Sequence, residues 1–399
     1  MRISTQTFQQ QWLTAIHDQQ SALAKIQGQI SSGKRLATAA DDPLGAAQIV
    51  RLQQGLDRFD GYTKNADTAR RRLSLEESTL GKVTDALDRV RELAVRAGGA
   101  AGAPDARAAI ADEARQILSN LLDLANTQDA EGRFLFSGNQ VHSQPFSRAG
   151  SSITYSGDGG TRSERIGDNR LVQEGDPGSE VFQKILNGNG TFSVQPDAAN
   201  TGDAFYSSAS VSDPSAWIPD DYSVQFNGNG PFTYEVRNGA GTVISSGAFA
   251  PGDTVAFQGA AVTFEGQPAD GDSFNISASR NQDIFKTVQN FVDSLDKSLQ
   301  TPTDHATAQS ELNSSLLDID RALENIGIVH SRVGTRLSVI DEQLLTNSDV
   351  TLQLSESLSS VRDVDYASAI SELQSRLFSL EAAQKTFQST RQFSLFNIL

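Results

Sequence analysis

The sequence predicts a mainly α-helical protein with a β-rich insertion, in which both ends of the chain form a long antiparallel helical bundle or coiled-coil rod. Apolar residues recur at alternating three- and four-residue steps through both halves, which is typical of helices that pack along one seam. Between these halves, residues 139–280 hold 19 of the chain's 32 glycines. That middle region also alternates apolar and polar residues, which is typical of β-strands.

The first helix is expected to end at Gly33, because glycine readily adopts the left-handed conformation that stops a helix. The surrounding stretch "GQISSGKR" has the glycine spacing of a nucleotide phosphate loop. However, Lys34 is followed by Arg35 instead of Ser or Thr, and a helical pattern precedes the loop where a phosphate loop needs a strand. We therefore expect a helix end and no nucleotide site.

A second helix is expected from about 44 to 97, because Asp42 followed by Pro43 is a strong start signal. The glycine-rich stretch "AGGAAGAPDA" interrupts it, and a further helix is expected to end near Gly132. A short connection between long helices predicts an antiparallel hairpin. The predicted seam residues of this half are Leu56, Phe59, Leu73, Leu80, Leu87 and Val90.

The downstream half mirrors this pattern. One helix is expected to be closed by Pro302, and the next to begin at Thr303 or Asp304. His330 lies on the apolar seam of that helix, so we expect it to be a buried, hydrogen-bonded core residue. The stretch "RDVDYAS" breaks the heptad phase and separates a last helix. The predicted seam residues of this half are Leu323, Ile326, Leu337 and Ile340.

The middle region contains strand-like runs such as "YSVQF" and "FTYEV", punctuated by the hairpin-turn signal "NGNG". The stretch "QPDAANTGDA" resembles a linker, so we divide the region near residue 195. The predicted domains are an N-terminal assembly helix (1–40) that pairs with a C-terminal one (362–399), two halves of a helical rod (41–138 and 281–361), a β-rich excursion (139–194) and an outer β domain (195–280).

Composition argues against several classes of function. A net charge of −16 is unfavourable for a nucleic-acid partner, and the chain has no cysteine for disulfides or thiolate metal sites. No window is apolar enough for a membrane span, and the first 20 residues lack the apolar run of a cleaved signal peptide. The four histidines are scattered, so we expect no metal, no cofactor and no catalytic constellation.

Three blocks resemble the bacterial flagellin family: "ISSGKRLATAADDPLGAAQI", "LDRVRELAVRA" and "VRDVDYASAISELQSRLF". They occur in the family's order and cover the helical portions, residues 1–140 and 281–399. The resemblance implies a subunit of the flagellar axial structure outside the cell. It also implies that an export chaperone holds the chain before it leaves unfolded through the flagellar type III apparatus.

Within that family, "MRIST", "GRFLFSG" and "FSLFNIL" resemble the branch that joins the hook to the filament. That branch implies a homo-oligomeric ring between the first hook-associated protein and flagellin. Two alternatives stay open, namely the flagellin filament subunit itself and a secreted coiled-coil adhesin or glycan-binding module. An exposed site around Trp217, Tyr222 and Tyr234 would favour the adhesin, although these residues also suit an ordinary β core.

The terminal helices are amphipathic, and each lacks the apolar surface to fold alone, so their apolar residues are predicted to form the assembly interface. These residues are Ile3, Phe8, Leu13, Ile16, Leu23, Ile26, Ile30, Ile370, Leu373, Leu377, Leu380, Phe387, Phe393, Leu395 and Leu399. The family resemblance also implies a surface for an innate immune receptor at Arg89, Leu93 and Glu113. An ordinary helix face is the alternative interpretation of those three residues.

Overall fold

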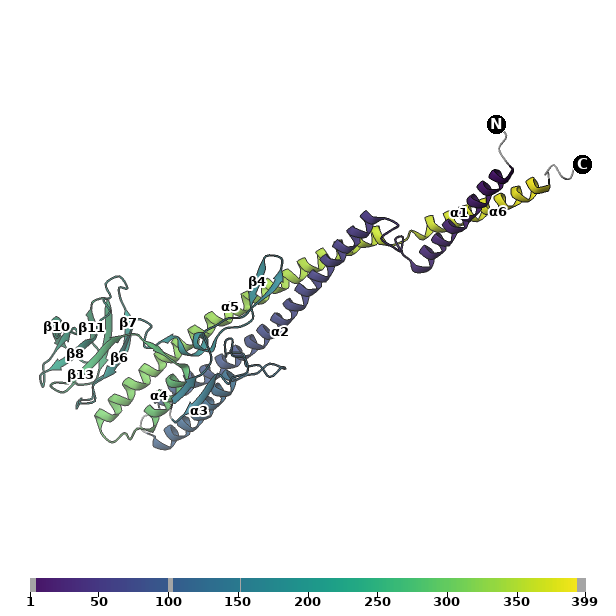
Figure 1. Cartoon of the computed structure of the whole chain (residues 1–399). Helices are drawn as coiled ribbons and strands as arrows, with labels where there is room; N and C mark the ends of the chain where they lie inside the picture. The colour runs from purple at the N-terminus through teal and green to yellow at the C-terminus, as the bar shows by residue number, and fades with distance from the viewer. Residues whose placement is uncertain (1–4, 100–102, 151, 393–399) are drawn as a thin grey trace, which may run out of the picture. The chain divides into compact units, whose positions relative to one another are not determined.

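Helices form both ends of the chain and strands form its middle, as the sequence predicts (Figure 1). The computed structural model describes residues 5–99, 103–150 and 152–392. Its α-helices are α1 (Thr5–Ser32), α2 (Pro43–Gly99), α3 (Pro104–Ala125), α4 (Ile284–Asp296), α5 (Pro302–Arg362) and α6 (Tyr366–Gln392). A single π-helical turn, η1, spans Ser179–Gln183.

The strands of the inner region are β1 (Phe146–Ala149), β2 (Ser152–Tyr155), β3 (Ser163–Gly167), β4 (Arg170–Gln173), β5 (Ile185–Leu186) and β14 (Asn281–Gln282). The outer strands are β6 (Phe192–Pro196), β7 (Phe205–Val211), β8 (Tyr222–Asn227), β9 (Phe232–Arg237), β10 (Val243–Phe249), β11 (Thr254–Phe257), β12 (Ala260–Glu265) and β13 (Ser273–Ala278).

The predicted helix ends at Gly33 and Asp42 are confirmed. Gly33 has a φ of +69°, and a Cβ atom there would lie 3.0 Å from the hydroxyl of Tyr366. The Asp42 Oδ1 atom accepts the backbone N–H of Gly45 at 2.9 Å, so it caps α2. The phase break at "RDVDYAS" is confirmed as well, because α5 ends at Arg362 and α6 begins at Tyr366.

The chain divides into two compact units, which we call the terminal unit (Met1–Lys64 with Glu342–Leu399) and the central unit (Asn65–Asp341). This division lies inside α2 and α5, whereas the sequence placed the boundaries of the terminal domains at residues 40 and 362. Both long helices therefore contribute residues to each unit.

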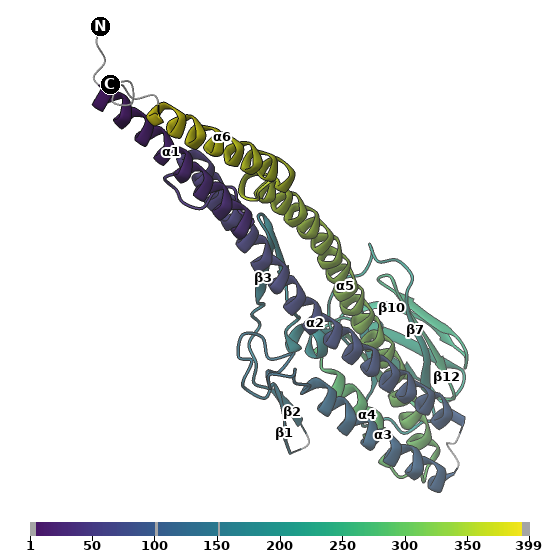
Figure 2. The same cartoon turned by 90° about the vertical axis from the view of Figure 1, so that its right-hand side faces the viewer.

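Within the central unit, α2 and α5 run antiparallel (Figure 2). Three side-chain pairs show this, because the partners' numbers fall along α5 as they rise along α2. These pairs are Arg70–Asp341 at 3.7 Å, Glu77–His330 at 4.0 Å and Arg91–Asp320 at 2.6 Å.

Most of the predicted seam residues in the central unit are fully buried, namely Leu73, Leu80, Leu87, Val90, Ile326 and Ile340. Leu323 and Leu337 are only partly buried, while Val329 and Val333 are buried in the same helix. In the terminal unit Phe59 is buried and Leu56 is partly exposed. The expectation for His330 was wrong, because its side chain is 43% exposed and faces the carboxylate of Glu77.

Two shorter helices, α3 and α4, pack against each other. Arg107 donates to the backbone carbonyl of Ser294 at 2.9 Å, and Arg115 pairs with Asp296 at 2.6 Å. The sequence placed the end of α3 near Gly132, but the helix ends at Ala125. Asn126 stops it there, since its side chain bonds both the N–H and the C=O of Phe146.

The inner strands form three antiparallel pairs, β1–β2, β3–β4 and β5–β14. Next to β1, β2 and η1, a cluster of aromatic rings packs on α4. Within it Phe146 contacts Phe182 at 5.4 Å and Phe285 at 5.2 Å between ring centroids, and Phe136 contacts Phe182 at 5.1 Å. Burying these large rings stabilises the inner region against the helices.

The outer strands form an outer module (residues 192–278) of two antiparallel sheets, ordered β10-β9-β8-β13-β6 and β11-β12-β7. The predicted division near residue 195 falls inside β6, which pairs with β13 and so belongs to this module. Phe226 lies in the core between Phe249, Phe264 and Phe274.

The three residues considered for an adhesin site belong to or pack against that core. Tyr222 is buried, and Trp217 and Tyr234 are partly buried against it. The ring of Trp217 lies 5.2 Å from Phe192 and 5.5 Å from Tyr222. An ordinary β core therefore accounts for all three.

We predict that Ile326→Ala lowers the free energy of unfolding by about 2–5 kcal/mol, because it removes a fully buried side chain between α5 and its neighbours and leaves a cavity. Ile328→Ala is the matched control, since that side chain on the same helix is 55% exposed. The control should change the stability by less than about 0.5 kcal/mol. Urea unfolding of both variants measures the difference, and equal losses would contradict this packing.

Candidate assembly interface

The terminal helices α1 and α6 lie side by side (Figures 1 and 2). A short antiparallel bridge joins them at the end where α1 stops and α6 starts. The N–H of Arg35 donates to the carbonyl of Arg362 at 2.7 Å, and the N–H of Val364 donates to the carbonyl of Gly33 at 3.0 Å. Further along the pair, the rings of Trp12 and Phe387 lie 6.4 Å apart.

The terminal unit has almost no apolar core among its described residues. Its buried apolar side chains are Ile26, Phe59, Leu358 and Ala369. In contrast, nine of the fifteen exposed large apolar side chains in the described chain belong to this unit. They are Leu13, Leu44, Val50, Leu345, Leu352, Tyr366, Ile370, Leu377 and Phe378. Such a concentration of exposed apolar area is typical of an interaction surface.

The predicted interface residues differ in exposure. Ile26 is buried; those that are partly buried are Ile16, Leu23, Ile30, Leu373, Leu380 and Phe387. Leu13, Ile370 and Leu377 are exposed. Ile3, Phe393, Leu395 and Leu399 lie outside the described residues, as does the side chain of Phe8.

Sequence reasoning missed Phe378, which is 74% exposed, and the exposed leucines at the ends of α2 and α5. Phe378 follows Leu377 directly, so it lies off the apolar stripe that the helical periodicity selects. The signal that would have found it is a large aromatic residue on the polar side of an amphipathic helix.

The three residues of the expected receptor surface are not equally accessible. Arg89 on α2 pairs with Glu113 on α3 at 2.7 Å, and both side chains are 39% exposed. Leu93 is fully buried, so the folded subunit does not present it at the surface. The expectation that Leu93 lies on an exposed surface was wrong, because this residue is part of the buried apolar seam of α2.

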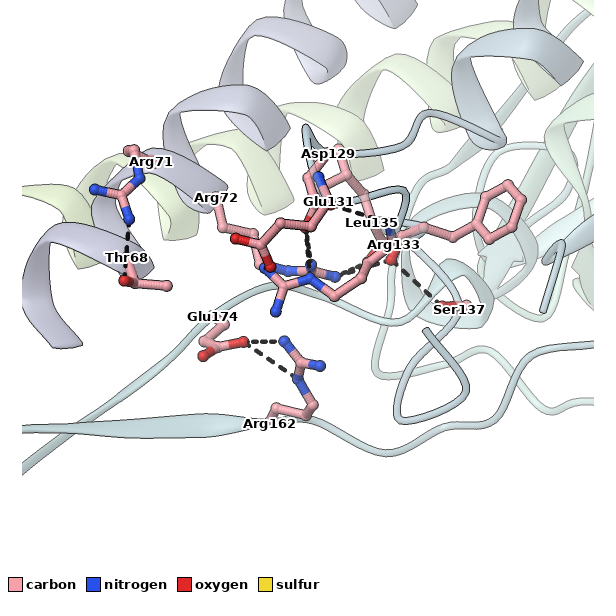
Figure 3. A network of polar contacts seen from close by, with 11 residues as sticks. Thr68, Arg71, Arg72, Asp129, Glu131, Arg133, Leu135, Ser137, Arg162 and Glu174 are labelled. Atoms are coloured by element: carbon pink, nitrogen blue, oxygen red, sulfur yellow. Dashed lines mark hydrogen bonds and ion pairs between the residues drawn. The ribbon is translucent and has the colours of Figure 1, made fainter. Parts of the chain in front are cut away.

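A second site lies in the central unit, where a segment with buried charged residues is fixed to α2 and α5. We call residues 126–178 the anchored segment. Arg72 on α2, with its side chain 5% exposed, pairs with Asp129 of this segment at 2.9 Å and donates to the carbonyl of Phe134 at 2.8 Å (Figure 3). Arg133 pairs with the same carboxylate of Asp129 at 2.9 Å.

The far end of the anchored segment contacts both long helices through Asp176. Its backbone N–H donates to Glu76 of α2 at 3.1 Å. Its carboxylate, with only 2% of the side chain exposed, pairs with Arg336 at 2.8 Å and Arg332 at 3.2 Å on α5. Beside it, Glu174 pairs with Arg162 (Figure 3). Asp176 therefore ties the segment to both helices.

Glu76 is almost completely buried in this site. Burial, followed by the negative charge of Asp176, raises the pKa of Glu76 to about 8, although the Asp176 N–H and the two nearby arginines act against the rise. Glu76 therefore mainly carries a proton at neutral pH. The sequence pattern gave no sign of this, because Glu76 and Asp176 are 100 residues apart.

A cavity of about 510 Å³ lies between α4, α5 and β6. Within the described ranges no three acidic, histidine or cysteine side chains are grouped to hold a metal ion. Over those same ranges, no helix combines the length and hydropathy needed to cross a bilayer.

Comparison with known proteins agrees with the helical ends and the β-rich middle. The family model of the bacterial flagellin N-terminal helical region matches residues 3–141. The crystal structure of Xanthomonas campestris FlgL is 34% identical with a TM-score of 0.72, over 76% of this chain and 99% of that one. Flagellar hook-associated protein 3 from Legionella pneumophila is 32% identical with a TM-score of 0.75, over 78% and 98%.

Similarity along the whole chain distinguishes the relatives further. Flagellar hook-associated protein 3 of Salmonella typhimurium is 25% identical over 100% of this chain and 99% of its own length. Polar flagellin F of Vibrio parahaemolyticus is 28% identical but over only 27% of this chain. The paired terminal helices and the matched N-terminal region define a protein of the flagellin class. Within that class, the chain belongs to the family of flagellar hook-associated protein 3, FlgL, whose members are structural components of the bacterial flagellum.

We predict that Arg72→Ala lowers the free energy of unfolding by about 3–5 kcal/mol, because it leaves the largely buried Asp129 and two backbone carbonyls without this cation. Arg71→Ala is the matched control, since the neighbouring Arg71 is exposed and donates to Thr68 on the same helix. Calorimetry of the two variants tests this, and a stability loss confined to Arg71→Ala would contradict it.

Proposed function

We propose that this chain forms the junction between the flagellar hook and the flagellin filament, as a homo-oligomeric ring without catalytic activity. The first hook-associated protein would lie on the hook side and flagellin on the filament side. The similarity along the whole chain to hook-associated protein 3 supports this role over that of a filament subunit, because flagellins such as polar flagellin F and phase 1 flagellin match only 27% and 35% of the chain.

The observation that carries the proposal is that the described residues of the terminal unit bury few apolar side chains and expose many. Burying a large apolar side chain contributes about 1.5–3 kcal/mol, so the exposed set on α1, α6 and the adjoining ends of α2 and α5 stabilises contacts with neighbouring subunits. In the ring, the terminal helices of adjacent copies and of the two flanking proteins would cover these residues. Assembly then supplies the burial that the subunit lacks alone.

We further propose the route by which the subunit reaches its place. An export chaperone would hold the terminal helices before the chain passes unfolded through the flagellar type III apparatus, without a cleaved signal peptide. Exposed apolar side chains on α6, such as Leu377 and Phe378, support this, since they need cover before assembly.

We also propose that α2 and α5 supercoil as a coiled coil. Their antiparallel side-chain pairs and their sustained apolar seam support this proposal.

A deletion strain tests the role directly. Cells without this chain should lack filaments and release flagellin monomer into the medium, and antibody labelling of isolated flagella should mark one band between hook and filament. Label along the whole filament would instead identify a flagellin. Motile cells with reduced attachment would favour the secreted adhesin.

We predict that Phe378→Ser abolishes complementation of the deletion strain while it changes the melting temperature of the purified monomer by less than about 2 °C, because the side chain is 74% exposed in the subunit. Val243→Ser in the outer module is the control, since this side chain is 41% exposed and lies outside the terminal unit. Cells with the control variant should swim normally. Normal filaments with Phe378→Ser would remove this residue from the interface.

A further inference from the structure

The anchored segment contacts Glu76 through its backbone. The Glu76 Oε1 atom accepts the N–H of Asp176, and a Cβ atom on Gly175 would lie 3.1 Å from the other carboxyl oxygen, Oε2. The backbone of residues 175–176 therefore lies directly on the Glu76 carboxyl group. Asp176 also binds α5 through Arg332 and Arg336. A change in the charge of Glu76 therefore affects the residue, Asp176, that contacts both α2 and α5.

Charged groups face Glu76 from every element packed around it. Arg72 comes from α2 itself, Asp176 from the segment after β4, and Arg332 and Arg336 from α5. Further out, Arg162 and Glu174 pair with each other, and Arg133 and Asp129 do the same beside Arg72. Arg332 and Arg336 donate hydrogen bonds to the carboxylate of Asp176, so their positive charges already pair with that group.

We propose that Glu76 is a proton-dependent latch, which holds residues 174–178 against α2 and α5 while it is protonated and loosens them when it ionises. When Glu76 is protonated, the site contains one carboxylate, Asp176, between two arginines. When Glu76 is ionised, its buried negative charge lies against the carboxylate of Asp176. Local opening of the segment relieves this by bringing water to Glu76.

The direction of the effect follows from proton linkage. Where the segment is detached, Glu76 ionises near its ordinary pKa of 4.5, whereas in the docked state burial and the Asp176 charge raise its pKa to about 8. Docking is therefore strongest below pH 4.5 and weakens as the pH rises toward about 8, where the loss is complete. The separation of the two pKa values corresponds to a weakening of roughly three orders of magnitude.

Hydrogen exchange of the full chain, followed by mass spectrometry at pH 5 and pH 8.5, tests the latch. After correction for intrinsic rates, protection of the peptide that contains Asp176 should fall at least about 100-fold between the two pH values. A peptide from β8 in the outer module is the internal reference and should keep its protection. Unchanged protection around Asp176 in the wild-type chain would overturn the proposal.

Two glutamates on adjacent positions provide a matched pair of variants. Glu76→Gln keeps the acceptor for the Asp176 N–H but cannot ionise. In this variant, the peptide that contains Asp176 should therefore be strongly protected from hydrogen exchange at both pH values. Glu77→Gln changes a carboxylate that is 46% exposed and faces His330, and its exchange should depend on pH as in the wild type. A loss of the pH dependence in Glu77→Gln, or its persistence in Glu76→Gln, would assign the effect to another group. If Glu76→Gln does not fold, the wild-type comparison with β8 decides alone.

Discussion

The antiparallel contact between α2 and α5 is the interaction on which the central unit depends. Its apolar residues are buried on both helices, and α3, α4 and the aromatic cluster around Phe146 pack beside it. Charged side chains then fix the anchored segment to these helices, with Arg72 at one end and Asp176 at the other. Buried ion pairs contribute little net stability when made, but breaking one is costly. We therefore infer that these ion pairs determine the position of the anchored segment on α2 and α5.

The same two helices continue into the terminal unit, where the packing is different. There the described residues bury few apolar side chains, and exposed ones such as Leu345 and Phe378 remain. Ordering a helix costs about 1–2 kcal/mol per residue in backbone entropy, which only tertiary burial offsets. The structure of one subunit thus explains the stability of the central unit by itself, whereas we propose that contacts with other subunits stabilise the terminal unit.

Local patterns in the sequence predicted the elements that depend on local physics. The long apolar repeat located α2 and α5, and the Asp42–Pro43 start and the Gly33 stop were correct because caps act within a few residues. The end of α3 was misplaced because Asn126 bonds Phe146, 20 residues away. The division near residue 195 falls inside β6, which belongs to the outer module because it pairs with β13, far along the chain. The latch could not be found for the same reason, since Glu76 and Asp176 meet only in the folded chain.

We propose that the subunit's own stability resides in residues 65–341 and that the terminal unit depends on assembly. Thermal unfolding of the full chain and of the continuous fragment 65–341, compared by circular dichroism in dilute solution, tests this proposal. We expect the fragment to melt within a few degrees of the main transition of the full chain, because the described residues of the terminal unit bury few apolar side chains. A fragment that is unfolded, or that melts far below the full chain, would contradict it.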